Sequence, residues 1–539
     1  MKGIFCLFVL FTIFLFSSSS DGIAGKKVLV YLPITGHSHL KFMGTVANIL
    51  QDEGYNVTLL MPLIDFTLND TIPIVRKIKH SIRLDIDHRV LRAINNLGGK
   101  KSRQQTWTMR SGIHGLYSIS HLLSDLYSYT CDNIFHTPEL LERLKSEKFE
   151  IGISEPFFVC GFALFDHIGI EKIISIDSHI GVEAAKIAHG SAITSSFLPA
   201  AFSEGSDHMT FLERVQNLYD TWLNRKFALL IQDKELEGMR GIYTRKDTWQ
   251  EIMQLPAYMF TNNNPLLDFP YPRTSKFIEV GGIAADEKKS DERLPEFYNE
   301  ILNRRSKTVL ISFGSNAKSV FMPQEMKTSL IMAFSSMPDV TFIWKYEDKS
   351  VNIVREFNSS ISNIVLVEWM PQQALLADPR LDLFVTHGGL ASTNEVAFSG
   401  KPSVMVPVFG DQTRNARMLE RHGTAIVLQK EDLKNPEVVA AAIRNCLSDA
   451  KFAQRAGKLA ELLTNQPESP REVFLKYFNF VARFGKPSGI DSNAANLSFF
   501  AYYYLDLALA VAVAGYILIS LLAGTYMSYV VFLRKEKSD

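Results

Sequence analysis

Residues able to hold a phosphorylated ligand follow a short apolar run in the second half of the chain. The run ends at Thr386, the loop His387–Gly389 follows, and a helical pattern begins shortly after it. Glycines let backbone N–H groups approach a ligand closely, and the N-terminus of a helix favours an anion. A histidine in such a loop can donate a further hydrogen bond to a diphosphate. The loop also has a purely structural interpretation, because Ser392 and Glu395 have the spacing of a capping box.

A second group of reactive side chains follows the first apolar run of the mature sequence, in the segment Gly36–His39. A histidine at the carboxyl end of a strand can act as a general base, because its unperturbed pKa lies near neutrality. Both His37 and His39 are placed for this role. The alternative is that one or both of them only cap the following helix.

Both groups depend on the same supporting unit, a short apolar strand followed by a helix. In the first half, the pattern predicts a strand over 27–33, a helix over 40–53 and strands over 57–61 and 149–154. In the second half, strands are predicted at 307–313, 364–367, 381–386, 403–406 and 425–428. Such alternation is typical of parallel α/β sheets, in which ligands bind at the carboxyl ends of the strands. A stretch rich in proline and asparagine at 262–273 predicts a connector between two halves.

The polar residues after these strands resemble the donor-binding signature of the UDP-glycosyltransferases, and the animal UDP-glucuronosyltransferase branch is the best match. The matching residues are Trp369, Pro371 and Gln372, the His387–Gly389 loop with Ser392 and Glu395, and Asp411 and Gln412 with Asn415. The resemblance covers nearly the whole chain and implies an α/β fold of the GT-B class, with two Rossmann-like domains facing a cleft and one C-terminal transmembrane helix. The implied parts are a signal peptide (1–20), an acceptor-binding domain (21–264), a linker (265–285), a UDP-sugar-binding domain (286–490), a transmembrane helix (507–533) and a cytosolic tail (534–539).

The resemblance also implies a catalytic base in the Ser38-His39 pair, and we therefore favour His39 over His37. A carboxylate that orients the other ring nitrogen of such a base stabilises the imidazolium that forms during the reaction. Relatives carry an aspartate after the strand that corresponds to 149–154, whereas this chain has Glu155. The extra methylene leaves the geometry of the pair open. Asp166, in the following helix, is the weaker substitute.

The remaining candidates are expected to bind the donor. Trp369 can stack on uracil. The other expected contacts are Gln372 and Glu395 with the ribose hydroxyls, Ser315, His387, Gly389 and Ser392 with the diphosphate, and Asp411 and Gln412 with the sugar hydroxyls. Arg414 follows them closely in the sequence, and we expect it to pair with the carboxylate of glucuronate.

The expected reaction is inverting transfer of glucuronate from UDP-glucuronate to a hydroxyl of a small lipophilic acceptor. UDP-glucose is the alternative donor, and a non-catalytic membrane protein that binds lipophilic ligands is the alternative from another class. The resemblance implies no cofactor and no metal ion, since the UDP-sugar is a co-substrate. Equal numbers of basic and acidic residues, 57 each, argue against a nucleic-acid partner. The sequence leaves open whether the chain forms a homo-oligomer.

Both ends of the 539-residue chain are apolar. Residues 1–20 have the pattern of a secretory signal peptide, with an uncleaved anchor as the alternative. Residues 507–533 are long enough to cross a bilayer, and the basic residues after them predict a cytosolic C-terminus. Lys535 and Lys537 resemble a dilysine retrieval signal, and the alternative is a plain stop-transfer cluster. Together these features predict a single-pass protein of the endoplasmic reticulum membrane with lumenal catalytic domains.

The chain has four cysteines and four sequons, and the sequons fit a lumenal location. Only Cys131, Cys160 and Cys446 follow the signal segment, an odd number without metal-binding spacing, so a disulfide framework is not implied. The sequons are at Asn56, Asn69, Asn358 and Asn496. We expect Asn56 to remain unmodified, because it lies in a predicted strand.

Overall fold

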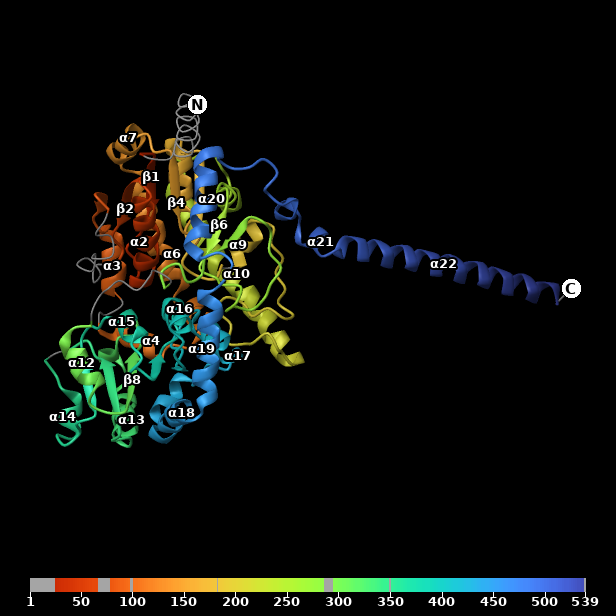
Figure 1. The fold of residues 1–539 in the computed structure, drawn as a ribbon. Helices are drawn as coiled ribbons and strands as arrows, with labels where there is room; N and C mark the ends of the chain where they lie inside the picture. The colour runs from red at the N-terminus through yellow and green to blue at the C-terminus, as the bar shows by residue number, and fades with distance from the viewer. Residues whose placement is uncertain are drawn as a thin grey trace, which may run out of the picture.

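A computed structural model describes residues 25–65, 78–96, 100–181, 183–285, 294–348 and 350–537. Two α/β domains form its body, and one long helix leaves the body at the C-terminal end (Figure 1). The expected signal peptide and the sequon at Asn69 lie outside the described residues.

The first domain is built on a seven-stranded parallel sheet with the order β3-β2-β1-β4-β5-β6-β7. Its strands are β1 (Lys27–Tyr31), β2 (Asn56–Pro62), β3 (His80–Leu84), β4 (Ile151–Ser154), β5 (Lys172–Asp177), β6 (Met259–Thr261) and β7 (Phe277–Glu279). The central strands are apolar runs covered on both faces, as parallel sheets require. The strand order reverses between β1 and β4, and such a switch point opens a ligand-binding crevice at the carboxyl ends of the strands.

Helices cover both faces of this sheet. The helices of this half of the chain are α2 (His37–Asp52), α3 (His88–Asn96), α4 (Lys100–Thr108), α5 (Gly112–Ser118), α6 (Ser120–Phe135), α7 (Pro138–Ser146), α8 (Cys160–Ile168), α9 (Glu183–Ala188), α10 (Phe211–Met239) and α11 (Trp249–Met253). Among them, α4 packs instead on the second domain, where Trp107 is buried beside Phe313. Helix α2 begins three residues before the predicted start at 40. Consequently His37 and His39 lie in its first turn, close behind the end of β1.

The second domain repeats the plan with a six-stranded parallel sheet in the order β10-β9-β8-β11-β12-β13. Its strands are β8 (Lys307–Ser312), β9 (Val340–Lys345), β10 (Ile364–Val367), β11 (Leu383–Thr386), β12 (Ser403–Met405) and β13 (Ala425–Val427). The helical segments are α12 (Glu296–Leu302), η3 (Ser319–Phe321), α13 (Gln324–Ser335), α14 (Ile353–Phe357), α15 (Gln372–Ala377), α16 (Leu390–Ser399), α17 (Gln412–Arg421), η4 (Lys430–Lys434), α18 (Pro436–Ser448) and α19 (Ala450–Thr464). The expected pair of Rossmann-like domains is confirmed.

The chain returns to the first domain before it ends. Helix α20 (Pro470–Phe484) buries Phe474 and Phe478 completely in the core beneath β1 and β2. Its apolar positions recur every three or four residues and form one face, which explains the packing. The sequence analysis placed this helix in the second domain (286–490), whereas in the structure it packs on the first. Likewise, β7 belongs to the first sheet although it lies within the expected linker (265–285).

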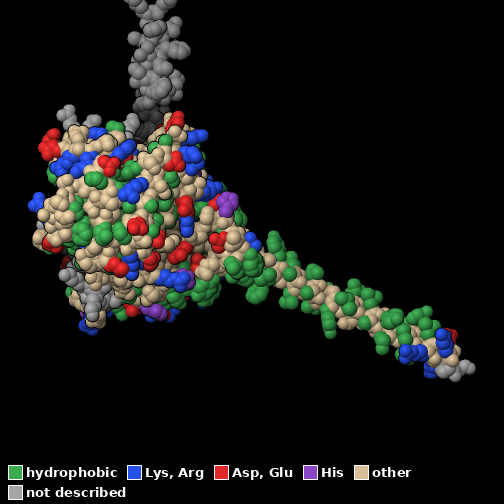
Figure 2. All heavy atoms as spheres, turned by 90° about the horizontal axis from the view of Figure 1, so that it is seen from below, with side chains coloured by type: hydrophobic (Ala, Val, Ile, Leu, Met, Phe, Trp, Pro, Cys, Tyr) green, Lys and Arg blue, Asp and Glu red, His purple; other side chains and the backbone are tan. Residues whose placement is uncertain are grey.

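After η5 (Asn493–Asn496) and α21 (Phe499–Tyr502), helix α22 (Leu505–Glu536) extends away from the body (Figures 1 and 2). It has 32 residues, its most apolar 18-residue window has a mean hydropathy of 2.4, and none of that window is buried. At about 1.5 Å per residue it exceeds the ~30 Å hydrocarbon core of a bilayer. By length and composition it is a candidate membrane span.

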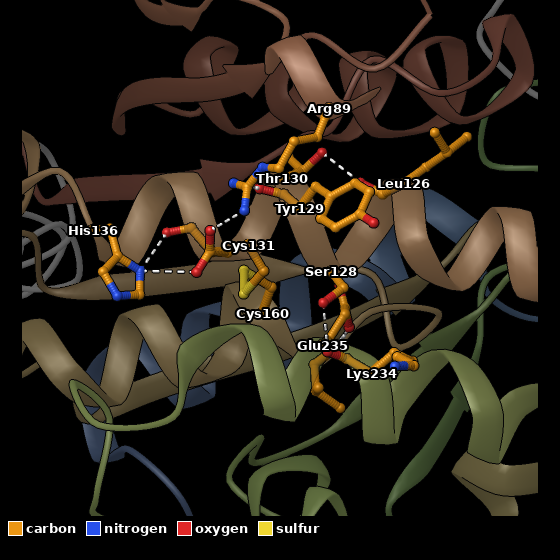
Figure 3. Close-up of a disulfide and its surroundings, with 12 residues drawn as sticks. Arg89, Leu126, Ser128, Tyr129, Thr130, Cys131, His136, Cys160, Lys234 and Glu235 are labelled. Atoms are coloured by element: carbon orange, nitrogen blue, oxygen red, sulfur yellow. Dashed lines mark hydrogen bonds and ion pairs between the residues drawn. A yellow bond between two sulfur atoms is a disulfide. The ribbon is translucent and has the colours of Figure 1, made fainter. Parts of the chain in front are cut away.

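A disulfide joins Cys131 in α6 to Cys160 at the start of α8 (Figure 3). The sequence did not imply this disulfide. The two residues are 29 positions apart, and only the packing of the first domain brings their helices together. Among the described residues, Cys446 in the second domain is a free thiol and is buried.

Candidate functional site

A cleft between the two domains collects the carboxyl ends of strands from both sheets. Ten of the eleven predicted site residues line it: His39, Ser315, Trp369, Gln372, His387, Gly389, Ser392, Glu395, Asp411 and Gln412. The eleventh, Glu155, is buried behind His39. Residues that are far apart in the sequence thus form one site.

His39 and Glu155 form a hydrogen-bonded pair at the switch point of the first sheet. Nδ1 of His39 lies 2.8 and 3.0 Å from the two carboxylate oxygens of Glu155. The longer glutamate side chain therefore reaches the imidazole. This geometry assigns the Nδ1 proton to the bond with the carboxylate and leaves the Nε2 lone pair free, on a residue that lines the cleft. Asp166, the weaker candidate, is engaged elsewhere, with Tyr243 and Arg245.

The carboxylate of Glu155 is ionised at neutral pH despite its burial. Burial alone would raise the pKa of Glu155, but the adjacent His39 and a hydrogen bond from Ser178 hold it below its usual range. The backbone N–H of Ser178 donates to Oε1 of Glu155 at 3.2 Å. The Ser178 hydroxyl oxygen also lies 3.1 Å from Nδ1 of His39. The Glu155 carboxylate and the Ser178 hydroxyl therefore both fix the orientation of the ring, and the Ser178 N–H holds the carboxylate in place.

His37 has a different environment. Its ring meets the edge of Trp369 at a centroid distance of 5.5 Å. Burial, with Lys41 and Lys345 nearby, lowers the pKa of His37 to about 4. An imidazole with so low a pKa is a weak base, so the geometry and electrostatics favour His39 as the base of the pair.

On the opposite wall, the loop His387–Gly389 connects β11 to α16. Gly388 has φ +80°, a conformation that favours glycine. A Cβ at Gly389 would stand 2.7 Å from the His387 ring, and one at Gly314 would stand 2.6 Å from it. Burial, reinforced by Lys345, lowers the pKa of His387 to about 3. The ring is therefore neutral and keeps one N–H donor for a ligand.

Helix α16 begins at Leu390, directly after the loop, with Gly389 as its N-cap and no side chain bonded to its first N–H groups. Ser392 and Glu395 lie inside the helix, so the capping-box interpretation is wrong. Their side chains are instead linked through Gln372, whose amide nitrogen donates to the Ser392 hydroxyl at 3.2 Å and to the Glu395 carboxylate at 2.6 Å. The open N-terminus in the cleft suits an anion.

Trp369 presents a largely exposed ring, 60% accessible, at the far end of the cleft. The Lys345 ammonium lies 4.8 Å from the centre of that ring and donates to the Gly314 carbonyl at 2.9 Å. Ser315 follows in the same loop and also lines the cleft. A flat aromatic face beside a cation is suited to stacking a nucleobase.

Asp411 and Gln412 lie where α17 begins. Asp411 accepts a hydrogen bond from the Asn415 amide at 2.8 Å, and the Gln412 side-chain oxygen accepts from the N–H groups of Val408 and Phe409 at 2.9 and 3.0 Å. The Gln412 amide N–H groups and the second Asp411 oxygen are the polar atoms available to a ligand.

Arg414 does not belong to the cleft. Its guanidinium is 1% exposed and forms a buried ion pair with Asp268 at 2.6 Å. It also lies over the Phe269 ring at 5.1 Å. The expected contact with a glucuronate carboxylate is therefore wrong, because the guanidinium is paired with Asp268 and the side chain does not line the cleft.

Several lining residues were missed from the sequence. Ser178 and His179 follow β5 directly, and Lys41 crosses the cleft from α2 to form an ion pair with Glu395. The strand-end rule that identified His39 could have found Ser178 and His179, because they occupy the equivalent place after a neighbouring strand. No such signal marked Lys41.

The chain is similar to known glycosyltransferases. The family model described as "UDP-glucoronosyl and UDP-glucosyl transferase" matches residues 26–538. The Caenorhabditis elegans protein ugt-56, whose name provisionally places it among the UDP-glucuronosyltransferases, is 28% identical over 450 residues, covering 83% of this chain and 84% of its own. Human UDP-glucuronosyltransferase 1A6 is 23% identical over 515 residues, covering 94% of this chain and 91% of its own.

Solved glycosyltransferase structures share the fold. The glycosyltransferase VinC in complex with DTDP is similar with a TM-score of 0.57 at 14% identity, covering 85% of this chain and 99% of its own. LpCGTa in complex with UDP gives a TM-score of 0.54 at 14% identity, with the same two coverages. The GT-B fold is thereby confirmed. With a family model that spans nearly every residue of the two domains and the C-terminal helix, the chain belongs to the UDP-glucoronosyl and UDP-glucosyl transferase family.

Proposed function

We propose that this protein transfers glucuronate from UDP-glucuronate to a hydroxyl of a small lipophilic acceptor, with inversion at the anomeric carbon. The observation that carries the proposal is the His39–Glu155 pair, whose histidine has one ring nitrogen free and lines the cleft opposite the donor-side residues. A binding protein without catalysis would not need an ionised, buried carboxylate behind a histidine. UDP-glucose remains the second candidate donor, because the family description includes both sugars.

In the proposed reaction, the acceptor hydroxyl gives its proton to Nε2 of His39. The acceptor oxygen forms a bond to the anomeric carbon, and the bond from that carbon to the diphosphate breaks, its electron pair leaving with UDP. Glu155 stabilises the imidazolium through Nδ1. A positioned base of this kind contributes about 10²- to 10⁴-fold to the rate.

UDP would bind along the wall of the cleft that the second domain forms. Trp369 would stack on uracil, and Gln372 with Glu395 would bind the ribose. The diphosphate would lie at the N-terminus of α16, near the His387 ring and Ser392, where helix dipole and N–H donors stabilise the leaving charge. Ser315 would contribute a further hydroxyl, and Asp411 and Gln412 would bind the sugar hydroxyls.

We also propose that the catalytic domains lie in the lumen of the endoplasmic reticulum, with α22 as the single membrane anchor. The Cys131–Cys160 disulfide supports an oxidising compartment. Asn358 and Asn496 are exposed, as modified sequons must be, whereas Asn56 is half-buried in β2. Exposed apolar side chains on α10, among them Phe211, Leu212 and Trp222, support contact of the body with the membrane surface.

The direct test of the reaction is UDP formation by membranes that carry the full chain. UDP-glucuronate and UDP-glucose are each offered with a panel of phenols, and the anomeric configuration of the product is read by NMR. We expect UDP formation from UDP-glucuronate and a β-linked product. Turnover with UDP-glucose alone would identify UDP-glucose as the donor. A product that retains the α configuration would contradict the single-displacement mechanism.

A further inference from the structure

Because Arg414 is buried away from the cleft, the carboxylate of an anionic sugar needs another cation as its partner. Among the described residues that line the cleft, Lys41 is paired with Glu395 at the expected ribose end, and Lys345 lies over Trp369 at the expected nucleobase end. His179 lies elsewhere, at the end of the cleft that holds the catalytic pair.

His179 and Asp177 form a second histidine–carboxylate pair beside that of His39 and Glu155. Its Nδ1 lies 3.3 Å from Oδ1 of Asp177, and the same oxygen accepts the backbone N–H of His179 at 2.9 Å. Its ring meets the ring of His39 edge-on at a centroid distance of 5.0 Å and stacks against Phe157 at 5.9 Å. These contacts fix the ring and leave Nε2 as the ring atom that can meet a ligand.

The charges around His179 make it a cation. Burial alone would lower the pKa of His179, but the bond to Asp177 and the negative charges of Asp411 and Glu155 raise it to about 9. The imidazolium is thus held at neutral pH next to the residue expected to bind sugar hydroxyls. It also offsets the repulsion that the Asp411 carboxylate would exert on an anionic sugar.

We propose that His179 binds the carboxylate of the glucuronyl group and thereby sets the preference for UDP-glucuronate over UDP-glucose. The proposal rests on the proposed function and adds to it a specificity-determining residue in the acceptor-side domain. The sugar lies between the two walls, so its carboxylate can reach Nε2 of His179 while Asp411 and Gln412 hold its hydroxyls. A charged hydrogen bond of this type discriminates by about 10- to 100-fold.

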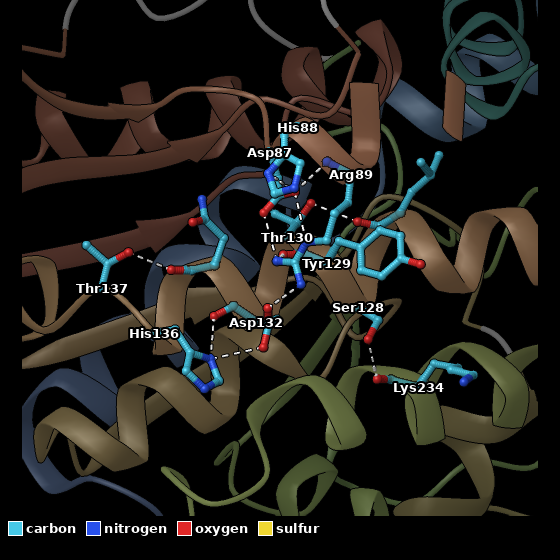
Figure 4. A network of polar contacts seen from close by, with 12 residues as sticks. Asp87, His88, Arg89, Ser128, Tyr129, Thr130, Asp132, His136, Thr137 and Lys234 are labelled. Carbon is cyan, nitrogen blue, oxygen red and sulfur yellow. Dashed lines mark hydrogen bonds and ion pairs between the residues drawn. The ribbon is translucent and has the colours of Figure 1, made fainter. Parts of the chain in front are cut away.

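The test compares His179→Gln with the wild-type full chain, using one neutral phenol and both donors. We expect kcat/KM for UDP-glucuronate to fall about 10- to 100-fold, mainly through a higher KM, while kcat/KM for UDP-glucose changes less than threefold. His136→Gln is the matched control, because His136 also pairs with an aspartate, Asp132, but lies outside the cleft (Figure 4). This control should leave both donors unchanged.

Equal losses with both donors would overturn the proposal and assign His179 to the positioning of His39. Unchanged donor preference would overturn it as well. A phenol that carries a carboxylate is tested in addition, and a loss confined to this acceptor, whichever donor is used, would overturn the proposal and place the anion in the acceptor.

The wild-type protein supplies a second readout that needs no variant. Because the pKa of His179 is about 9, the KM for UDP-glucuronate should rise relative to that for UDP-glucose above about pH 9. A KM ratio that stays flat across this range would contradict the proposal. If the wild-type protein used UDP-glucose only, the role of His179 would be refuted, although the protein would still be a glycosyltransferase. Absence of turnover with either sugar would contradict the proposed function itself.

Discussion

Replacing Glu155 by glutamine removes one negative charge and keeps the shape of the side chain. The carboxylate lies 2.8 and 3.0 Å from Nδ1 of His39 and is 2% exposed. In the transition state, the imidazolium and the carboxylate are about 4 Å apart between charge centres, which corresponds to about 4 kcal/mol at an effective dielectric constant of about 20. The amide oxygen of glutamine retains part of the hydrogen bond. We therefore expect a loss of about 10²- to 10³-fold in kcat.

Two further variants separate the charge from the geometry. Glu155→Asp keeps the charge but retracts it by about 1.5 Å, one C–C bond, so we expect an intermediate loss of about tenfold. Asp166→Asn is the matched control, because Asp166 is bonded to Tyr243 and Arg245 and does not touch His39. Its kcat should equal that of the wild type.

The assay is the initial rate of UDP formation at saturating acceptor, with the donor KM and the thermal midpoint measured for each variant. The donor KM should remain within about twofold, because Glu155 does not line the cleft. A Glu155→Gln variant that folds and retains more than a third of the wild-type kcat would refute the reasoning.

Three other changes test separate parts of the structure. Replacing both Cys131 and Cys160 by serine opens a loop of 29 residues and should cost about 3 to 4 kcal/mol of unfolding free energy, read as a lower thermal midpoint that reductant does not lower further. Arg414→Met leaves Asp268 buried without its partner and should lower the free energy of unfolding by about 3 to 5 kcal/mol. The ratio of kcat/KM for the two donors should stay constant, and a changed ratio would indicate that Arg414 contributes to donor binding. Trp369→Ala should raise the Kd for UDP roughly 3- to 10-fold by loss of stacking, and an unchanged Kd in a calorimetric titration would exclude the stacking role.

Most of the architecture could be predicted from the sequence because it rests on local patterns. The alternation of apolar runs and helices predicted two parallel sheets, and the strand-end rule placed His39, Ser315 and His387 at one site. The cleft-lining donor residues lie in the loops after these strands or in the first two turns of the helices that follow.

The errors concern the direction of side chains and contacts between distant segments. Arg414 is three residues from Asp411, yet it forms a buried ion pair with Asp268 and does not line the cleft. Its spacing from Asp411 did not define which partner its side chain would meet. The Cys131–Cys160 pair depends on the packing of α6 beside α8. Lys41 and Glu395 are 354 positions apart and meet only because two domains face each other.

The most direct test of the account is UDP formation by the His39→Ala variant, with UDP binding measured separately by calorimetry. The account predicts that transfer falls by at least about 10²-fold while the Kd for UDP is unchanged, because His39 belongs to the acceptor-side wall. Transfer at the wild-type rate in this variant would contradict the assignment of His39 as the base and, with it, the proposed mechanism.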